Sequence, residues 1–167
     1  AVPTTYFSPP STSQERDDAI DVKNQVFNSG NGELNNPNKK IFFWNSRNAR
    51  RKQSGTLIWW FKEFLDEVGH DKATLLMHTD ARDQHGQDLP HILDRLRLND
   101  GQVMLSTAKV GPADLANMYR AADYTIGISD AEGFGLSTLE SLSCGTPIIV
   151  NMTGGLQEQV TDGTNWF

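Results

Sequence analysis

The 167-residue sequence has a single cysteine, Cys144, and no long apolar run. One cysteine excludes an internal disulfide framework and fits a reducing compartment, so we expect a cytoplasmic protein. No stretch approaches the roughly 20 apolar residues that a membrane-spanning helix requires. Together with a mean hydropathy of -0.50, these absences describe a soluble protein without a membrane helix.

Basic residues are also scarce, with 15 Lys and Arg against 21 Asp and Glu, which gives a net charge of -6. An acidic protein repels the phosphates of nucleic acid unless a local basic patch compensates. The one dense basic run is Arg47 to Lys52. We therefore expect no nucleic-acid partner, and a local role for this run.

The first 38 residues differ in composition from the rest of the chain. They are rich in Pro, Ser, Asn, Gly and Asp, and only Glu15 to Phe27 has a helical pattern. We interpret residues 1–38 as a linker and lead-in segment, and residues 39–167 as one domain. The chain begins Ala1-Val2-Pro3 and stops just after Trp166, so we expect a piece of a longer protein, truncated at its C-terminal end.

From Lys40 onward, short apolar runs alternate with helical patterns. The predicted strands cover residues 41–45, 73–78, 102–106, 124–129 and 147–150, and the predicted helices cover residues 54–68, 89–96, 112–122, 136–143 and 156–160. This alternation predicts an α/β protein with a doubly wound, Rossmann-like parallel sheet that is covered on both faces. Ligands bind such sheets beyond the carboxyl ends of the strands, so the loops that follow the strands should share one rim.

The predicted helix 54–68 carries large apolar residues at helical spacing. We expect five of them to face the core, namely Leu57, Trp60, Phe61, Phe64 and Leu65. Trp59 should face another way. In the helix that follows, Asp88 is expected to be the N-cap before Leu89 and Pro90.

The stretch "DAEGFGLSTLE", residues 130–140, is open to several interpretations. Asp130 and Glu132 resemble an acidic pair that holds a divalent metal on a diphosphate. A nucleophile elbow at Ser129 fails because no histidine follows it in the chain, and a dinucleotide fingerprint is weak because Thr138 stands at the third glycine position. A glycine-rich loop followed by a helix whose glutamate favours the macrodipole is the alternative without a ligand.

A physical argument favours an anion or sugar ligand at this loop. Gly133 and Gly135 allow a close approach of the backbone. The N–H groups of Phe134, Gly135, Leu136 and Ser137 lie at a predicted helix start, where such donors lack helical partners and suit a phosphate or sugar oxygen. The acidic and histidine residues at 78, 80, 83 and 85 fit no standard metal spacing and are interpreted as a polar loop.

The glutamates of "EGFGLSTLE", Glu132 and Glu140, form an E-x7-E motif. The likeness continues in "YRAADYTIGIS", "SCGTPIIV", "GGLQEQVTDGTN", "VPTTYFSP" and the R-x4-K pair of "SRNARRK", Arg47 and Lys52. In order and combination, these segments resemble the C-terminal, donor-binding lobe of retaining glycosyltransferases of the GT-B fold, family 4 or group 1 type. The resemblance covers nearly the whole chain, with two departures. Asn45-Ser46 stands where many relatives have glycine before the arginine, and we expect the helices that return to the other lobe to lie beyond this chain.

The resemblance implies a nucleotide-sugar-binding domain whose donor is a nucleoside-diphosphate sugar such as a UDP- or GDP-sugar, with no cofactor and no metal. The implied catalytic residues are Arg47 and Lys52, which neutralise the departing diphosphate, and Glu132, which accepts hydrogen bonds from donor-sugar hydroxyls. Phe134, Gly135, Leu136, Ser137 and Glu140 are the implied binding residues, Glu140 through the ribose. The nucleobase is expected near residues 108–110.

The resemblance further implies a hexosyltransferase whose acceptor, a glycan, lipid or protein, binds an N-terminal lobe outside this chain. The chain alone should then be inactive, and peripheral membrane association of the full-length protein is compatible with this function. Three alternatives remain open. They are a sugar-nucleotide epimerase of the same architecture, a non-catalytic sugar-nucleotide-binding lobe, and a metal-dependent transferase that uses Asp130 and Glu132.

Overall fold

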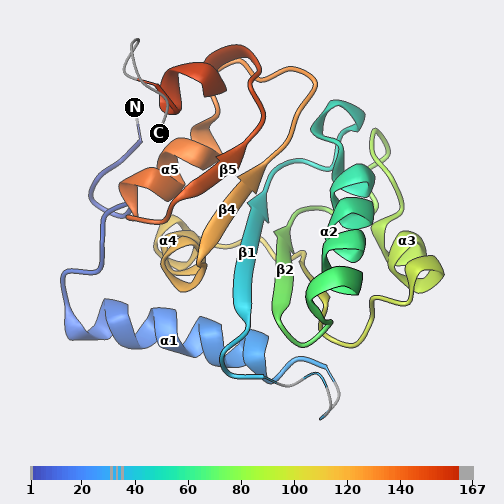
Figure 1. Ribbon diagram of the computed structural model, residues 1–167. Coiled ribbons are helices and arrows are strands. Elements are labelled where there is room, and N and C mark those ends of the chain that lie inside the picture. Colours follow the sequence, from blue (N-terminus) through green and yellow to red (C-terminus); the bar gives the residue numbers. More distant parts are fainter. Residues whose placement is uncertain (1, 31, 33, 35, 162–167) are drawn as a thin grey trace.

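The computed structural model describes residues 2–30, 32, 34 and 36–161, and it contains a five-stranded parallel sheet (Figure 1). The strands are β1 (Lys40–Asn45), β2 (Ala73–His78), β3 (Val103–Ser106), β4 (Tyr124–Gly127) and β5 (Ile148–Val150). Their order is β3-β2-β1-β4-β5, and every neighbouring pair is parallel. The predicted doubly wound α/β fold is confirmed.

The helices are α1 (Ser13–Phe27), α2 (Ser54–Val68), α3 (Leu89–Leu96), α4 (Pro112–Ala121) and α5 (Leu136–Ser143), with short 3-10 helices η1 (Arg50–Lys52) and η2 (Gly154–Gln159). The predicted bounds of α2, α3 and α5 are confirmed, and Asp88 caps α3 by accepting a hydrogen bond from the His91 N–H. Strand β4 ends two residues earlier than expected. None of the helices in the described part of the chain is long and apolar enough to span a membrane.

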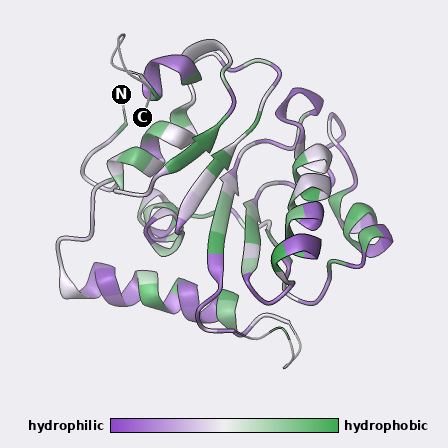
Figure 2. Ribbon diagram, in the orientation of Figure 1, coloured by the Kyte–Doolittle hydropathy of each residue, from purple (hydrophilic) through white to green (hydrophobic). Residues whose placement is uncertain are grey.

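The sheet is buried on both faces because β1 and β2 are apolar at successive positions. Trp44 and Met77 pack with α2 and α3 on one face, whereas Phe43 and Leu76 pack with α1 and α4 on the other. Strands of a parallel sheet that is covered on both sides have such continuous apolar runs. Figure 2 shows β1, β2 and β5 as largely hydrophobic, whereas α1 is largely hydrophilic.

One part of the prediction for α2 is wrong. Leu57, Phe61 and Leu65 are buried, but Trp60 is 55% exposed and Phe64 is 39% exposed. Helix α2 lies over β1 and β2, and its Trp60 edge extends toward β4 and β5, where it borders an open apolar hollow lined also by Tyr124, Ile126 and Ile149. Helical spacing predicts which side of a helix is apolar, but it does not predict how much of that side the neighbouring elements cover.

The N-terminal segment packs on the domain through α1. The predicted helix is confirmed and begins two residues earlier, after a capping box in which the Thr12 side chain accepts from the Glu15 N–H. Phe7 and Val26 are buried against α4 and the sheet, so this segment contributes to the core. The boundary at residue 38 stays a prediction, and Trp166 lies outside the described residues.

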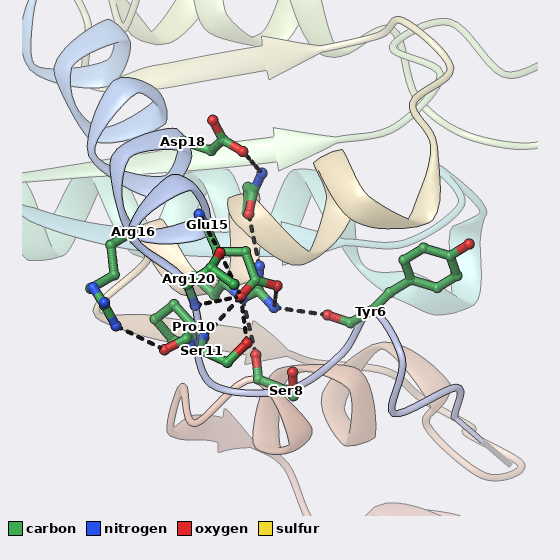
Figure 3. Close-up of polar contacts among 10 residues, drawn as sticks. Tyr6, Ser8, Pro10, Ser11, Glu15, Arg16, Asp18 and Arg120 are labelled. Atoms are coloured by element: carbon green, nitrogen blue, oxygen red, sulfur yellow. Dashed lines mark hydrogen bonds and ion pairs between the residues drawn. The ribbon is translucent and has the colours of Figure 1, made fainter.

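A buried arginine of α4, Arg120, holds this segment in place (Figure 3). Its guanidinium donates to the carbonyl oxygens of Ser8 at 2.9 Å and Tyr6 at 3.0 Å, and to the Glu15 carboxylate at 3.0 Å. Its side chain is 4% exposed. Hydrogen bonds from Ser11 and Thr12, together with the charge of Arg120, lower the pKa of Glu15 to about 2.

Replacing Arg120 should therefore detach the N-terminal segment. We expect Arg120→Met to lower the free energy of unfolding by about 3 kcal/mol, because it leaves a carboxylate and two carbonyls without their buried donor. Urea unfolding monitored by circular dichroism measures the loss, and limited proteolysis tests whether residues 2–12 become cleavable.

The matched control is Arg16→Met, since the Arg16 side chain is exposed and its only acceptor among the described residues is the Pro10 carbonyl, at 3.4 Å. This change should shift stability by less than about 0.5 kcal/mol. Equal effects of the two substitutions would contradict the anchoring role of Arg120.

Candidate functional site

The order of the strands creates a crevice at the carboxyl end of the sheet. β1 lies between β2 and β4, and Phe42 pairs with Tyr124 across the β1–β4 boundary. The chain winds to opposite sides of this boundary, which is where open α/β sheets bind their ligands. Two loops therefore meet there, the β1–α2 loop (46–53) and the β4–α5 loop (128–135).

Between these two loops lies a pocket of about 300 Å³. It is lined by Asn45, Ser46, Lys52, Glu132, Phe134, Gly135, Leu136 and Ser137. All of the site residues predicted from the sequence belong to this lining except Arg47 and Glu140. The tertiary structure thus brings most of the predicted site together in one place.

Lys52 and Glu132 form an ion pair in this pocket, although they are 80 residues apart in the chain. Their side chains are 12% and 17% exposed. Charges with so little solvent around them need a partner, because removal from water disfavours an isolated charge. The pair places a cation and a carboxylate side by side within the pocket.

Arg47, the other predicted cation, is directed away from this pair. Its Nε donates to Asp83 at 2.7 Å, its Nη2 lies 3.0 Å from His85 Nδ1, and its side chain is 63% exposed. The Arg47 guanidinium, together with the His85 backbone N–H, holds the pKa of Asp83 well below its ordinary value. The loop after β2 thus contributes an anchor for Arg47.

The β1–α2 loop is itself held by Asn48, which the sequence analysis did not single out. Asn48 is fully buried, donates to the Gln87 carbonyl at 2.7 Å and accepts from the Ser54 hydroxyl at 2.8 Å. A Cβ on Gly86 would lie 2.0 Å from the Asn48 carbonyl oxygen. This close packing fixes the loop that carries Lys52.

The start of α5 presents unpaired backbone donors to the pocket. Gly135 is the N-cap, with φ of +77°, and a Cβ there would lie 2.5 Å from Leu156 Cδ2. Within the described residues, the N–H groups of Gly135, Leu136 and Ser137 have no acceptor. Such donors at a helix N-terminus favour an anion.

Glu140 lies one turn further along α5, at the end of a buried hydrogen-bond chain. Tyr119 donates to its carboxylate at 2.8 Å, and Asn45 donates to the Tyr119 oxygen at 2.9 Å. Burial raises the pKa of Glu140, and the Tyr119 hydroxyl offsets part of this effect. Asn45, which lines the pocket, thereby connects it to Glu140 through Tyr119.

The β4–α5 loop is held from two sides by residues that the sequence analysis missed. On the β1 side, Arg51 donates to the Ala131 carbonyl at 2.8 Å and Gln53 donates to Asp130 at 2.8 Å. On the β5 side, the contacts come from Asn151, Thr153, Gly155 and Gln159. The sequence signal was the pair Gly154-Gly155, because a Cβ on Gly154 would lie 1.8 Å from the Glu132 carbonyl oxygen.

The acidic residues of the site take protein donors as partners. Asp130 accepts from Gln53, and Glu132 pairs with Lys52. Over the part of the chain that the structure describes, no three His, Cys, Asp or Glu side chains are grouped so that they could hold a metal ion. The pocket therefore suits a ligand that has both an anionic part and a part rich in hydroxyl groups.

Comparison with known proteins identifies the family and the fold of the chain. Residues 31–167 match the family described as Glycosyl transferases group 1, and the chain belongs to that family. Its α/β fold is that of one lobe of the GT-B glycosyltransferases.

The similar curated proteins are D-inositol 3-phosphate glycosyltransferases. The protein from Streptosporangium roseum is 50% identical over 52 residues, which are 31% of this chain and 12% of that protein. A second, from Catenulispora acidiphila, is 41% identical over 76 residues, 44% of this chain and 18% of that protein. The matched regions thus span less than a fifth of the length of these relatives.

Two solved structures show the same fold at 20% sequence identity. Anabaena HepE, in complex with UDP and glucose, aligns with a TM-score of 0.73 over all of this chain and 40% of its own. The C-terminal domain of a group 1 glycosyl transferase from Francisella tularensis aligns with a TM-score of 0.68 over all of this chain and 78% of its own.

The raised pKa of Glu140 makes a prediction about stability. The folded state favours the protonated Glu140 carboxyl, so ionisation of this group lowers the free energy of unfolding. The loss is absent below pH 4.5, the ordinary pKa, and is complete once the pH has risen through the folded-state pKa. We expect Glu140→Gln to melt at a higher temperature than the parent at pH 8, with the difference shrinking towards pH 4. Thermal unfolding at the two pH values measures this, with the exposed Glu63→Gln as control. A lower melting temperature of Glu140→Gln at pH 8 would contradict it.

Proposed function

We propose that this chain is the nucleotide-sugar-binding lobe of a retaining glycosyltransferase that transfers a sugar from a nucleoside-diphosphate sugar to a glycan, lipid or protein acceptor without a metal. The observation that carries the proposal is the Lys52–Glu132 pair in the pocket at the β1–β4 crevice, beside N–H groups at the start of α5 that have no acceptor among the residues described.

The chemistry of a nucleotide sugar matches this arrangement. A diphosphate binds cations and N–H donors, whereas sugar hydroxyls need acceptors as well as donors. Lys52 and the N–H groups of Gly135, Leu136 and Ser137 suit the diphosphate. Glu132, next to Lys52, suits the sugar hydroxyls, and Glu140 suits the ribose.

Catalysis in this lobe would come from stabilising the leaving group. When the bond between the sugar and the diphosphate breaks, the electron pair stays on the phosphate oxygen, so negative charge increases there. Lys52 and the α5 N–H groups stabilise this charge more in the transition state than in the ground state. Arg47 would add to the effect after exchanging Asp83 for the diphosphate.

A UDP-sugar is the first donor to test, because HepE was solved with UDP and glucose. The curated relatives use an inositol phosphate acceptor by name, but this chain aligns with only a small part of each. We therefore propose only the chemical class of the acceptor and the reaction class of the whole enzyme. Retention and metal independence rest on the resemblance of the E-x7-E motif.

Calorimetric titration of the chain with UDP, GDP and ADP, free and sugar-linked, tests the proposal. We expect one base series to bind, with affinity unchanged by EDTA. Binding that EDTA abolishes would favour a metal-dependent transferase. Interconversion of the bound sugar without an acceptor would favour an epimerase, and failure of every nucleotide to bind would reject the donor-site assignment.

Two substitutions separate the roles of the ion pair. We expect Lys52→Met to weaken nucleoside diphosphate binding about tenfold or more, the effect of losing a charged hydrogen-bond donor. Glu132→Gln should instead strengthen binding of the sugar-free diphosphate, because Lys52 no longer has to break an ion pair with a carboxylate in order to bind it. The preference for the sugar-linked form over the free diphosphate should fall in this variant.

The matched control is Lys62→Met, which removes a lysine whose partner is Asp66 on the outer side of α2. Unchanged affinity in Lys52→Met, or equal losses in Lys52→Met and Lys62→Met, would remove Lys52 from the phosphate site.

A further inference from the structure

The segment that follows β5, residues 151–159, contacts the β4–α5 loop along its whole length. Asn151 donates to the Ser129 carbonyl at 2.7 Å and accepts from the Ser129 N–H at 3.1 Å. Thr153 donates to the Asp130 carbonyl at 3.1 Å, and the Gly155 N–H donates to the Glu132 carbonyl at 3.0 Å. Three peptide groups of the loop, those with the carbonyls of Ser129, Asp130 and Glu132, are thus held by one segment.

Gln159 makes the last of these contacts, at the end of the loop. Its Nε2 donates to the Phe134 carbonyl at 2.6 Å and to the Gly135 carbonyl at 3.0 Å. Its Oε1 accepts from the Thr138 hydroxyl at 2.7 Å. One side-chain amide therefore connects the two peptide groups that precede α5 with the first turn of that helix.

These contacts determine where the loop's N–H groups point. In a trans peptide, the carbonyl and the N–H of the same unit point in opposite directions. Gln159 holds the Phe134 carbonyl on its own side, and it shares the Gly135 carbonyl with the Thr138 hydroxyl and the Leu139 N–H of α5. The N–H groups of Gly135 and Leu136 therefore face away from Gln159. Gly135 and Leu136 line the pocket that contains Lys52 and Glu132, and neither N–H has an acceptor in the described chain.

We propose that Gln159 is a positioning residue, which orients the N–H groups of Gly135 and Leu136 toward the diphosphate of the donor. The proposal rests on the function proposed above and adds a residue that does not line the donor pocket. The physical benefit is preorganisation, because donors already fixed in direction bind an anion without the cost of ordering a flexible glycine loop.

The side chain at this position has to be a hydrogen-bond donor. Glutamate has nearly the same shape as glutamine but no N–H, so it would bring a carboxylate oxygen against two carbonyl oxygens. We expect Gln159→Glu to release the two peptide groups and to weaken UDP binding at least tenfold. Gln159→Ala, which introduces no charge, should weaken binding about threefold to tenfold.

The control is Gln157→Glu, which introduces the same charge two residues away on an exposed side chain. It should leave UDP affinity within twofold of the parent. Melting temperatures identify any variant that fails to fold. If Gln159→Glu does not fold, the UDP affinity of Gln159→Ala tests the proposal in its place.

The experiment is a titration of the ¹⁵N-labelled chain with UDP, followed by amide resonances and backbone order parameters. In the parent, UDP should shift the Gly135 and Leu136 amides. In the Gln159 variants, these shifts should decrease, and the order parameters of the two amides should fall while those of the strands do not. Parent-like UDP affinity in both folded Gln159 variants would overturn the proposal.

A parent chain that binds neither UDP nor another nucleotide would instead reject the proposed function. The order parameters still test Gln159 in that case. Unchanged values for Gly135 and Leu136 in Gln159→Ala would overturn its positioning role, and lowered values would support it.

Discussion

The pairing of β1 with β4 is the constraint on which the candidate site depends. The two strands are separated in the sequence by two complete helix–strand units, yet they are neighbours in the sheet. Because both end at the same edge, the loop that carries Lys52 and the loop that carries Glu132 meet there. Neither loop forms the pocket alone, so the site exists only when the sheet has this strand order.

Around this junction, the structure keeps charged groups where burial makes them costly. Lys52 and Glu132 compensate each other, and Glu140 is held by Tyr119 although burial opposes its ionisation. A domain selected for stability alone would favour apolar residues at such positions, since buried ion pairs are frequently no better than well-packed hydrophobic groups. Lys52 and Glu132 share one pocket, whereas Glu140 lies outside its lining, and the proposed donor binding gives the pair a role other than stability.

The site also depends on backbone held by other backbone. Gly154 and Gly155 allow the segment after β5 to approach the Glu132 loop more closely than any side chain would permit, and Gln159 completes the contact. On α4, Arg120 fastens the N-terminal segment in a comparable way, by donating to carbonyl groups. In both places, hydrogen bonds to backbone carbonyls add to apolar packing, by Phe7 in the N-terminal segment and by Leu156 after β5.

The sequence by itself determined the helix and strand succession, the parallel sheet, and most of the pocket, because hydrophobic periodicity and the residues of the E-x7-E loop are local properties of the chain. Only the tertiary structure decided which charges meet: Lys52 with Glu132, but Arg47 with Asp83. It also decided that Trp60 is exposed. It revealed Asn48, Tyr119 and Gln159, each of which makes a hydrogen bond to a residue 21 or more positions away. The reason is physical, since periodicity depends on nearest neighbours along the chain, whereas ion pairing, desolvation and peptide orientation depend on neighbours in space.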